Sequence, residues 1–286
     1  MVKQKIVTAF APASCANINC GFDILGFTLE SPGDTVILNI NARNKTIIKK
    51  ITGDNGRLPF DPKLNTATVA IDNLLTTLNI KIGIDVVIHK QMPLGSGLGS
   101  SAASSVAAIY ALNHLLDFNL NKHELIQYAM VGELAASGAI HADNVAPSML
   151  GGFTLIRSMS PLDIVQIPTP QNLYYTIIHP DLEINTHDAR GILKNYVSMN
   201  KVIEQSANLA GLITGLCTSN YALIGRSLHD VIIEPIRSLL IPKFDIIKNV
   251  ALESGAIGFG ISGSGPSIFT LNSDLDTAVA VGTTLN

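Results

Sequence analysis

The chain has 286 residues, of which 47% are hydrophobic and only 14% are charged, and its formal net charge is -3. This composition predicts a folded protein with a sizeable core, and it excludes a disordered chain and a basic surface for nucleic acid. Residues 102–116 form the most apolar stretch, which is too short to span a bilayer, and residues 1–10 lack the apolar core of a signal peptide. We therefore expect a soluble cytoplasmic protein without a nucleic-acid or membrane partner.

The order of the sequence patterns predicts an α+β protein. In the first half, strands are predicted at 6–10, 35–40, 46–51, 84–89 and 153–157, and helices at 65–78, 101–115 and 122–137. Residues 158–172 hold three prolines and are predicted to connect two domains, 1–167 and 168–286. In the second half, strands are predicted at 174–179, 257–261 and 268–271, and helices at 200–216, 221–228 and 244–254.

A glycine-rich segment, PLGSGLGSSAAS at residues 93–104, lies between a predicted strand and a predicted helix. Glycine allows the backbone to approach a ligand closely, and the free N–H groups at a helix start attract phosphate. The segment is not a Walker A loop, because no Gly-Lys-Ser/Thr ends it, and its glycine spacing does not fit the dinucleotide fingerprint. A flexible linker is the alternative, but a helix follows at once. We predict a phosphate-binding loop made of Pro93, Leu94, Gly95, Ser96, Gly97, Leu98, Gly99, Ser100, Ser101, Ala102, Ala103 and Ser104.

This segment resembles the central motif of the GHMP kinases, a family that includes galactokinase, homoserine kinase and mevalonate kinase. Two further motifs of the family are recognisable in the right order: PASCANINCGFD at residues 12–23 and GISGSGPS at residues 260–267. The first is most similar to the homoserine kinase version, PATSANLGPGFD, and departs from it at residues 18–20. The resemblance covers nearly the whole chain. It implies an N-terminal half like domain 2 of ribosomal protein S5 and a ferredoxin-like C-terminal half.

The resemblance also implies where ATP and Mg²⁺ bind. ATP is expected between the glycine-rich loop and the helix that begins near Asn65, and Mg²⁺ is expected on Ser101 and Glu133. Glu133 stands among small and apolar residues, where a carboxylate is unfavourable to bury without a cation. A solvent-exposed glutamate is the alternative reading.

The expected mechanism has no strong side-chain base. Some relatives, mevalonate kinase among them, place an aspartate base eleven residues after the glutamate, whereas this chain has Asn144, whose amide is not basic. We therefore expect the acceptor hydroxyl to attack directly once it is aligned. Asp143 is adjacent and is an alternative base, although we favour a structural role for it.

L-Homoserine is the acceptor that the resemblance implies, and its phosphorylation belongs to threonine biosynthesis. Such an acceptor needs an anion for its ammonium group and a cation for its carboxylate. Asp23 is a candidate for the former, and Arg190 and Arg237 for the latter. The resemblance assigns further substrate contacts to Asn17, His141, Asn144, Thr186 and Gly263. The residues expected to serve catalysis are Ser101, Glu133, Asn144, Thr186 and Arg190.

Two other functions remain open at this point. One is a GHMP kinase with another small alcohol acceptor, such as mevalonate, which has no ammonium group and would not need Asp23. The other is a catalytically inactive nucleotide-binding sensor, against which the intact Ser101 and Glu133 argue. Dimers are common in the family, so a homodimer is also left open.

Overall fold

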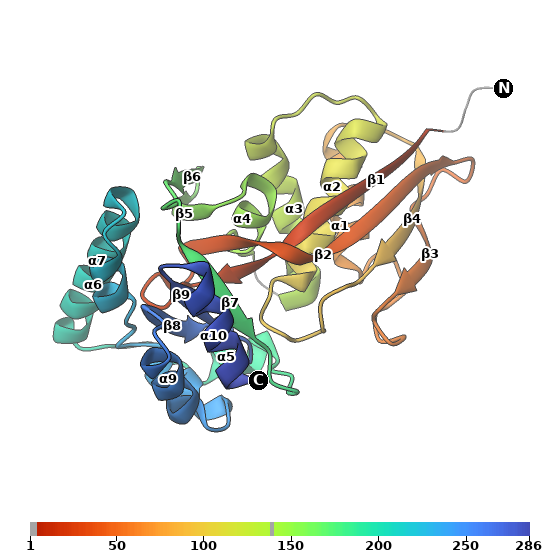
Figure 1. Cartoon of the computed structure of the whole chain (residues 1–286). Helices are drawn as coiled ribbons and strands as arrows, with labels where there is room; N and C mark the ends of the chain where they lie inside the picture. The colour runs from red at the N-terminus through yellow and green to blue at the C-terminus, as the bar shows by residue number, and fades with distance from the viewer. Residues whose placement is uncertain (1–4, 138–139) are drawn as a thin grey trace.

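Two β-sheets organise the chain in the computed structural model, which describes residues 5–137 and 140–286 (Figure 1). The first sheet has the order β3-β4-β2-β5-β6, and β1 also pairs with β2. The long central strand β2 reaches β5 at its start and β4 towards its end. The strands of this sheet are β1 (Ile6–Ala16), β2 (Leu25–Asn41), β3 (Ile47–Thr52), β4 (Gly83–His89), β5 (Phe153–Met159) and β6 (Leu162–Ile167).

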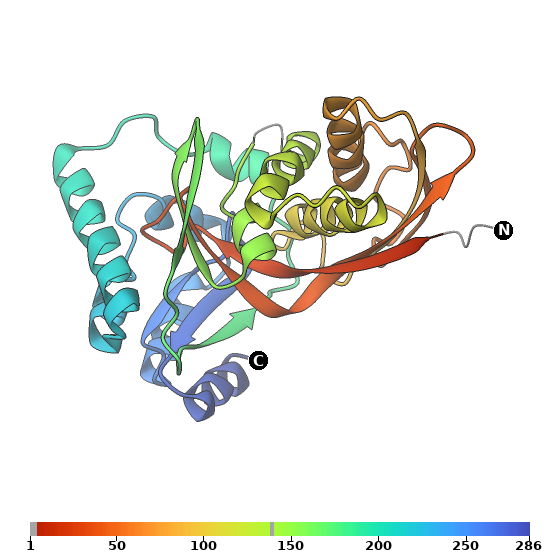
Figure 2. The same cartoon turned by 90° about the horizontal axis from the view of Figure 1, so that it is seen from above.

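Helices cover one face of the first sheet, as Figure 2 shows from above. Val36 and Leu38 of β2 are fully buried while their neighbours along the strand are partly exposed, so the strand turns one apolar face towards the helices. The central helix is rich in buried alanines, whose small side chains let it pack closely between the sheet and the other helices. The helices are α1 (Thr66–Thr77), α2 (Ser100–Leu115), α3 (Lys122–Ser137) and α4 (Val145–Leu150).

The second sheet is antiparallel and has the order β7-β9-β8. Its strands are β7 (Tyr174–Ile178), β8 (Gly258–Ile261) and β9 (Ile268–Asn272), and α10 packs on β7 and β9. The remaining helices of this half are α5 (Thr186–Gly191), α6 (Met199–Thr218), α7 (Tyr221–Ser227), α8 (Glu234–Arg237), the 3-10 turn Ser238–Leu240, α9 (Phe244–Glu253) and α10 (Leu275–Leu285).

An aromatic cluster joins the two sheets. The ring of Phe27 in β2 lies 5.1 Å from Phe153, 5.9 Å from Tyr175 and 5.5 Å from Phe269, measured between ring centroids. Phe153 belongs to the first sheet, whereas Tyr175 and Phe269 belong to the second. Rings at these separations add to the stabilisation that burial alone provides. The cluster therefore holds the two halves, and the loops they carry, in one arrangement.

The predicted α+β composition is confirmed, with corrections to individual elements. Strand β1 extends to Ala16, beyond the predicted 6–10, and helices α4, α5, α8 and α10 were not predicted. Strand β2 begins at Leu25, ten residues before the prediction, because its pairing with β1 resumes at Thr28 after a register shift beside the Pro-Gly segment that interrupts the strand pattern. Residues 162–167, predicted within the connection, form strand β6 of a hairpin with β5. The first sheet ends with Ile167 and β7 begins at Tyr174, while the division into domains 1–167 and 168–286 stays a prediction. No helix within 5–137 or 140–286 is long and apolar enough to cross a membrane.

Candidate active site

A cavity of about 610 Å³ collects residues from both halves of the chain. The wall includes the first motif, the end of β4, the start of α1, the glycine-rich loop, α3 and the segment before α4. It also includes α5, α8 and the loop before β9. Most of the residues predicted for the site line this cavity: Asn17, Asp23, Asn65, Leu94, Gly95, Ser96, Gly97, Gly99, Ser100, Ser101, Ser104, Glu133, His141, Asn144, Thr186, Arg190, Arg237 and Gly263.

The glycine-rich loop presents the free end of α2 to the cavity. Gly95, Gly97 and Gly99 all have positive φ, at 67°, 77° and 65°. Gly99 is the N-cap residue of α2, and neither a side-chain cap nor an acidic residue occupies the first turn. The first N–H groups and the positive end of the helix dipole are therefore available to a phosphate.

The three sequence motifs meet at this loop. Ser14 N–H donates to the Leu98 carbonyl at 3.1 Å, and the Ser262 hydroxyl donates to the Gly97 carbonyl at 2.7 Å. Ser267 N–H donates to the Ser96 carbonyl at 3.2 Å. The first and third motifs thus bind successive carbonyls of the loop, which leaves its N–H groups to face the cavity.

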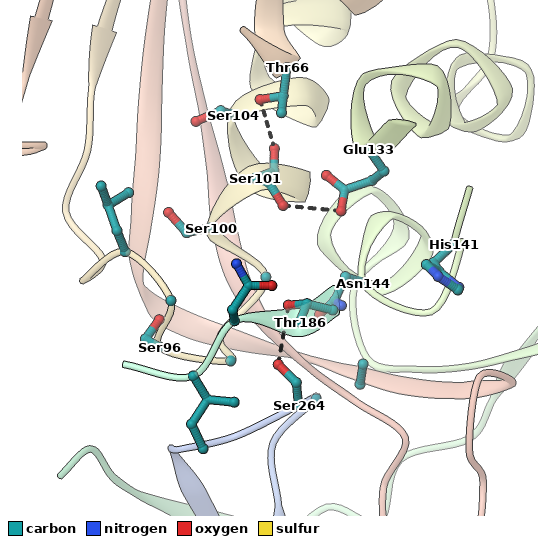
Figure 3. A pocket seen from close by; sticks show the side chains of 18 of the residues that line it. Thr66, Ser96, Ser100, Ser101, Ser104, Glu133, His141, Asn144, Thr186 and Ser264 are labelled. Carbon is teal, nitrogen blue, oxygen red and sulfur yellow. Dashed lines mark hydrogen bonds between the residues drawn. The ribbon is translucent and has the colours of Figure 1, made fainter. Parts of the chain in front are cut away.

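Ser101 and Glu133 point towards each other across the gap between α2 and α3 (Figure 3). The Ser101 hydroxyl donates to Glu133 Oε2 at 3.0 Å. Burial raises the pKa of the Glu133 carboxyl to about 7, although the Ser101 hydrogen bond and the charge of Lys90 oppose the shift. A buried carboxylate beside a hydroxyl, at the start of a helix, provides hard oxygen ligands for a divalent cation.

Sequence reasoning missed a buried ion pair beneath the loop. Lys90, at the end of β4, binds Asp34 of β2, and its ammonium also donates to the Ser100 carbonyl at 2.7 Å and to the Ser104 hydroxyl at 2.8 Å. The Lys90 side chain is 2% exposed, and burial lowers its pKa despite the attraction of Asp34. The Lys90 ammonium therefore stabilises the first turn of α2 through these hydrogen bonds.

Charged side chains gather at the other end of the cavity. Arg190 binds both carboxylate oxygens of Asp23, at 2.6 Å and 3.0 Å. Arg237 is buried, donates to the Gly263 carbonyl at 2.8 Å, and has its pKa lowered to about 10 by burial and by the nearby Arg190. The Asn17 amide donates to the same carbonyl at 2.8 Å and accepts the Asp23 N–H at 3.0 Å. The carboxylate of Asp23 and the two guanidinium groups thus lie together at this end of the cavity.

Polar side chains lie between the loop and this charged end. The Ser14 hydroxyl donates to Asn144 Oδ1 at 2.9 Å, and the Thr186 and Ser264 hydroxyls lie 3.2 Å apart. His141 lines the same wall, and burial lowers its pKa. Burial, aided by the charge of Asp23, raises the pKa of Asp143 to about 7.

Four residues of the predicted loop do not line the cavity. Leu98, Ala102 and Ala103 are buried in the core, because the first turns of α2 pack against the sheet, and Pro93 lies outside the lining. The residues that line the cavity without having been predicted include Thr66, Lys90 and Ser264. Lys90 lies close before the loop in the sequence and was the easiest of these to find, since lysine is a common phosphate ligand.

Comparison with known proteins identifies the family. Residues 65–152 match the "GHMP kinases N terminal domain" and residues 212–286 match "GHMP kinases C terminal". The chain belongs to the GHMP kinase family. It is therefore an ATP-dependent kinase of small molecules, and the predicted GHMP kinase fold is confirmed.

Several similar proteins are homoserine kinases. The kinase is 48% identical to a homoserine kinase of Chlorobium phaeobacteroides over 98% of this chain and 90% of the relative. A crystal structure of homoserine kinase from Cytophaga hutchinsonii superimposes with a TM-score of 0.96 at 49% identity, covering 100% of this chain and 90% of that one. A mevalonate kinase of L. major shares the fold, with a TM-score of 0.74 at 17% identity over 97% of this chain and 90% of the other. The predicted resemblance to homoserine kinases is confirmed.

Proposed function

We propose that this GHMP kinase is a homoserine kinase, which transfers the γ-phosphoryl group of ATP to L-homoserine and yields O-phospho-L-homoserine for threonine biosynthesis. The observation that carries the proposal is a single cavity with a phosphate-binding loop at one end and Asp23, Arg190 and Arg237 at the other. The similar homoserine kinases support the same choice of acceptor. A cytoplasmic location fits such an enzyme, because its two substrates are small metabolites.

The donor occupies the side of the cavity formed by the glycine-rich loop and α1. The N–H groups at the start of α2 bind its phosphates, and the charge of Lys90 beneath the first turn adds to the attraction. Asn65 caps α1, since its side chain accepts the Ala67 N–H at 3.1 Å, and it lines the cavity beside Thr66. We expect the Asn65 side chain to contact the rest of the nucleotide.

Ser101 and Glu133 are the residues that fit Mg²⁺. Their oxygens lie 3.0 Å apart in a buried position beside the loop, and Glu133 ionises more readily when a cation is near it. Across residues 5–137 and 140–286, no group of three or more His, Cys, Asp and Glu side chains lies together as a metal site. The two side chains would thus share the ion with the phosphates, and the ion supplies neutralisation of the charge that develops during transfer.

The charged end of the cavity fits a zwitterion better than a simple alcohol. Asp23 matches an ammonium group, and the two guanidinium groups match a carboxylate. Asp23 and Arg190 form an ion pair with each other at 2.6 Å. An acceptor with only one charge would leave one member of this pair without a partner, whereas L-homoserine replaces both partners at once.

The transfer step itself requires alignment more than proton abstraction. The acceptor hydroxyl attacks the γ-phosphorus, the new O–P bond forms as the bond to the ADP oxygen breaks, and the hydroxyl proton leaves with a phosphoryl oxygen as its nearest acceptor. Asn144, Thr186 and His141 line the cavity between the two ends and orient the hydroxyl. Asp143 also lines the cavity, with a pKa of about 7, and is the residue whose removal tests this step.

ADP release from Mg·ATP tests the proposal, measured with L-homoserine, mevalonate, L-serine, galactose and shikimate as separate acceptors. Strong release with L-homoserine alone is expected. Release with mevalonate instead would keep the kinase and remove the assignment of Asp23. Tight ATP binding without release for any acceptor would favour the inactive sensor.

A further inference from the structure

We propose that Phe22 is a positioning residue, which holds the guanidinium groups of Arg190 and Arg237 in place for the carboxylate of the acceptor. The inference rests on the proposed function, because it concerns the same acceptor site. Phe22 thereby has a role that the hydrogen bonds of the two arginines do not fulfil.

Both guanidinium groups lie over the same aromatic ring. The Cζ atom of Arg190 is 5.3 Å from the centroid of the Phe22 ring, and that of Arg237 is 5.0 Å from it. Both distances are within the ~6 Å over which a cation is attracted to an aromatic face. Phe22 therefore offers the negative face of its ring to two like charges that would otherwise repel each other.

The hydrogen bonds of the two arginines leave part of each guanidinium group unheld. Arg190 is held by Asp23 through its two terminal nitrogens, and Arg237 is held by the Gly263 carbonyl through one. Among the residues that the structure describes, neither Nε atom has a hydrogen-bond partner, although both atoms are buried. Aromatic contact with Phe22 is thus a further interaction that both groups share.

Phe22 acts from behind the arginines and not from within the acceptor site. The main cavity is lined by Asp23, Arg190 and Arg237 but not by Phe22. Phe22 instead borders a separate hollow of about 10 Å³, which has room for at most about one water molecule and none for an acceptor. Its effect on the substrate must therefore pass through the two arginines.

Phe22 and Asp23 are adjacent in the sequence and contact different parts of the Arg190 guanidinium. Asp23 has a φ of 61° and binds the terminal nitrogens of Arg190, while the preceding ring lies beneath the Arg190 Cζ atom. When an acceptor ammonium draws Asp23 away from Arg190, the ring still holds that guanidinium. Arg190 therefore keeps the rotamer that binds the acceptor carboxylate, and less conformational entropy is lost on binding.

The test compares Phe22→Leu, which removes the aromatic face, with Phe22→Tyr, which keeps it. The KM for L-homoserine is expected to rise about 5- to 30-fold in Phe22→Leu, and to stay within about 3-fold of wild type in Phe22→Tyr. The KM for ATP should stay within about 2-fold of wild type in both variants, since the ring does not line the cavity that contains the phosphate loop. An equal rise in both KM values would indicate a general structural defect and overturn the proposal.

A carboxylate-free analogue isolates the path through the arginines. L-2-Amino-1,4-butanediol carries a hydroxymethyl group in place of the carboxylate, and its inhibition constant against L-homoserine is defined whether or not it is phosphorylated. Phe22→Leu should weaken this analogue by less than about 2-fold. A loss as large as that for L-homoserine would show that the ring does not act through the carboxylate, and would overturn the proposal.

Chemical labelling supplies a readout that does not depend on the acceptor. Phenylglyoxal modifies accessible arginines, and mass spectrometry of the labelled protein gives the rate at each site, with the exposed Arg43 as internal reference. Labelling of Arg190 and Arg237 is expected to accelerate at least about 3-fold in Phe22→Leu but not in Phe22→Tyr. If the wild-type protein fails to phosphorylate L-homoserine, the proposed function is wrong. Faster labelling in Phe22→Leu would then still support the role of the Phe22 ring in holding the two arginines. Unchanged labelling together with an unchanged KM for L-homoserine in Phe22→Leu would overturn only the role of the Phe22 ring.

Discussion

A single methyl group at Gly97 should disable the phosphate loop. Gly97 has a φ of 77°, and a Cβ atom added there would lie 2.5 Å from the Ser262 carbonyl oxygen and 2.6 Å from that of Gly265. Carbon and oxygen normally stay more than ~3.2 Å apart, so the loop and the third motif must separate by about 0.7 Å. The same movement stretches the hydrogen bond from the Ser262 hydroxyl to the Gly97 carbonyl.

This displacement sets the expected size of the effect. A misplacement near 1 Å in a group that positions a substrate lowers the rate by about 100-fold, so kcat/KM for ATP should fall by roughly 30- to 100-fold in Gly97→Ala. Overpacking and the left-handed backbone together should lower the free energy of unfolding by about 2 to 4 kcal/mol. Steady-state kinetics with varied ATP and urea denaturation measure the two quantities.

Gly56 provides the matched control. It has a φ of 71°, but a Cβ atom there would meet nothing within 4 Å. Gly56→Ala therefore carries the same backbone strain without a collision, and it should lose about 1 to 2 kcal/mol of stability with little change in kcat/KM. If Gly97→Ala keeps a kcat/KM within about 3-fold of Gly56→Ala, the contact between the loop and the third motif does not shape the phosphate site.

Three further substitutions test the remaining roles. Glu133→Gln should lower kcat by at least about 100-fold while the Kd for metal-free ATP stays within about 3-fold, and normal turnover would remove Glu133 from the metal site. Arg190→Leu should raise the KM for L-homoserine about 10- to 100-fold with the KM for ATP nearly unchanged, whereas the exposed control Arg43→Leu should change neither. Asp143→Asn should retain most of the activity if no side-chain base is needed, and complete loss in a folded variant would identify Asp143 as the base. Folding raises the pKa of Asp143 from 3.8 to about 7, so its ionised form destabilises the folded state. The stability advantage of Asp143→Asn should therefore grow as pH rises from about 4 to 7, to at most about 4 kcal/mol in urea denaturation series.

Local sequence signals predicted the elements around the glycine-rich loop, whereas their role in donor binding stays a prediction. Asn65 caps α1, the glycine-rich loop has a run of positive φ angles, and α2 begins with an uncapped first turn. Each of these features is set by residues within a few positions of one another. Glu133 was also identifiable, because a carboxylate in an apolar helical segment demands a partner. Such features do not depend on how distant segments pack.

The pairings between distant residues were not predictable in the same way. Lys90 meets Asp34 only because β4 pairs with β2, and the bond between Arg190 and Asp23 joins positions 167 residues apart. The carboxylate and the guanidinium were each proposed as substrate ligands, but their mutual bond requires the two halves to be packed together. The stacking of both arginines on Phe22 depends on the same packing and leaves no local trace in the sequence.

Product analysis tests the central claim most directly. The protein is incubated with Mg·ATP and L-homoserine, and ³¹P NMR with mass spectrometry follows the fate of the γ-phosphoryl group. We predict one O-phospho-L-homoserine for each ADP formed, with no inorganic phosphate in excess of an acceptor-free control. ADP and inorganic phosphate without a phosphorylated acceptor, or unchanged ATP after prolonged incubation with a folded protein, would contradict the assignment of L-homoserine as the acceptor.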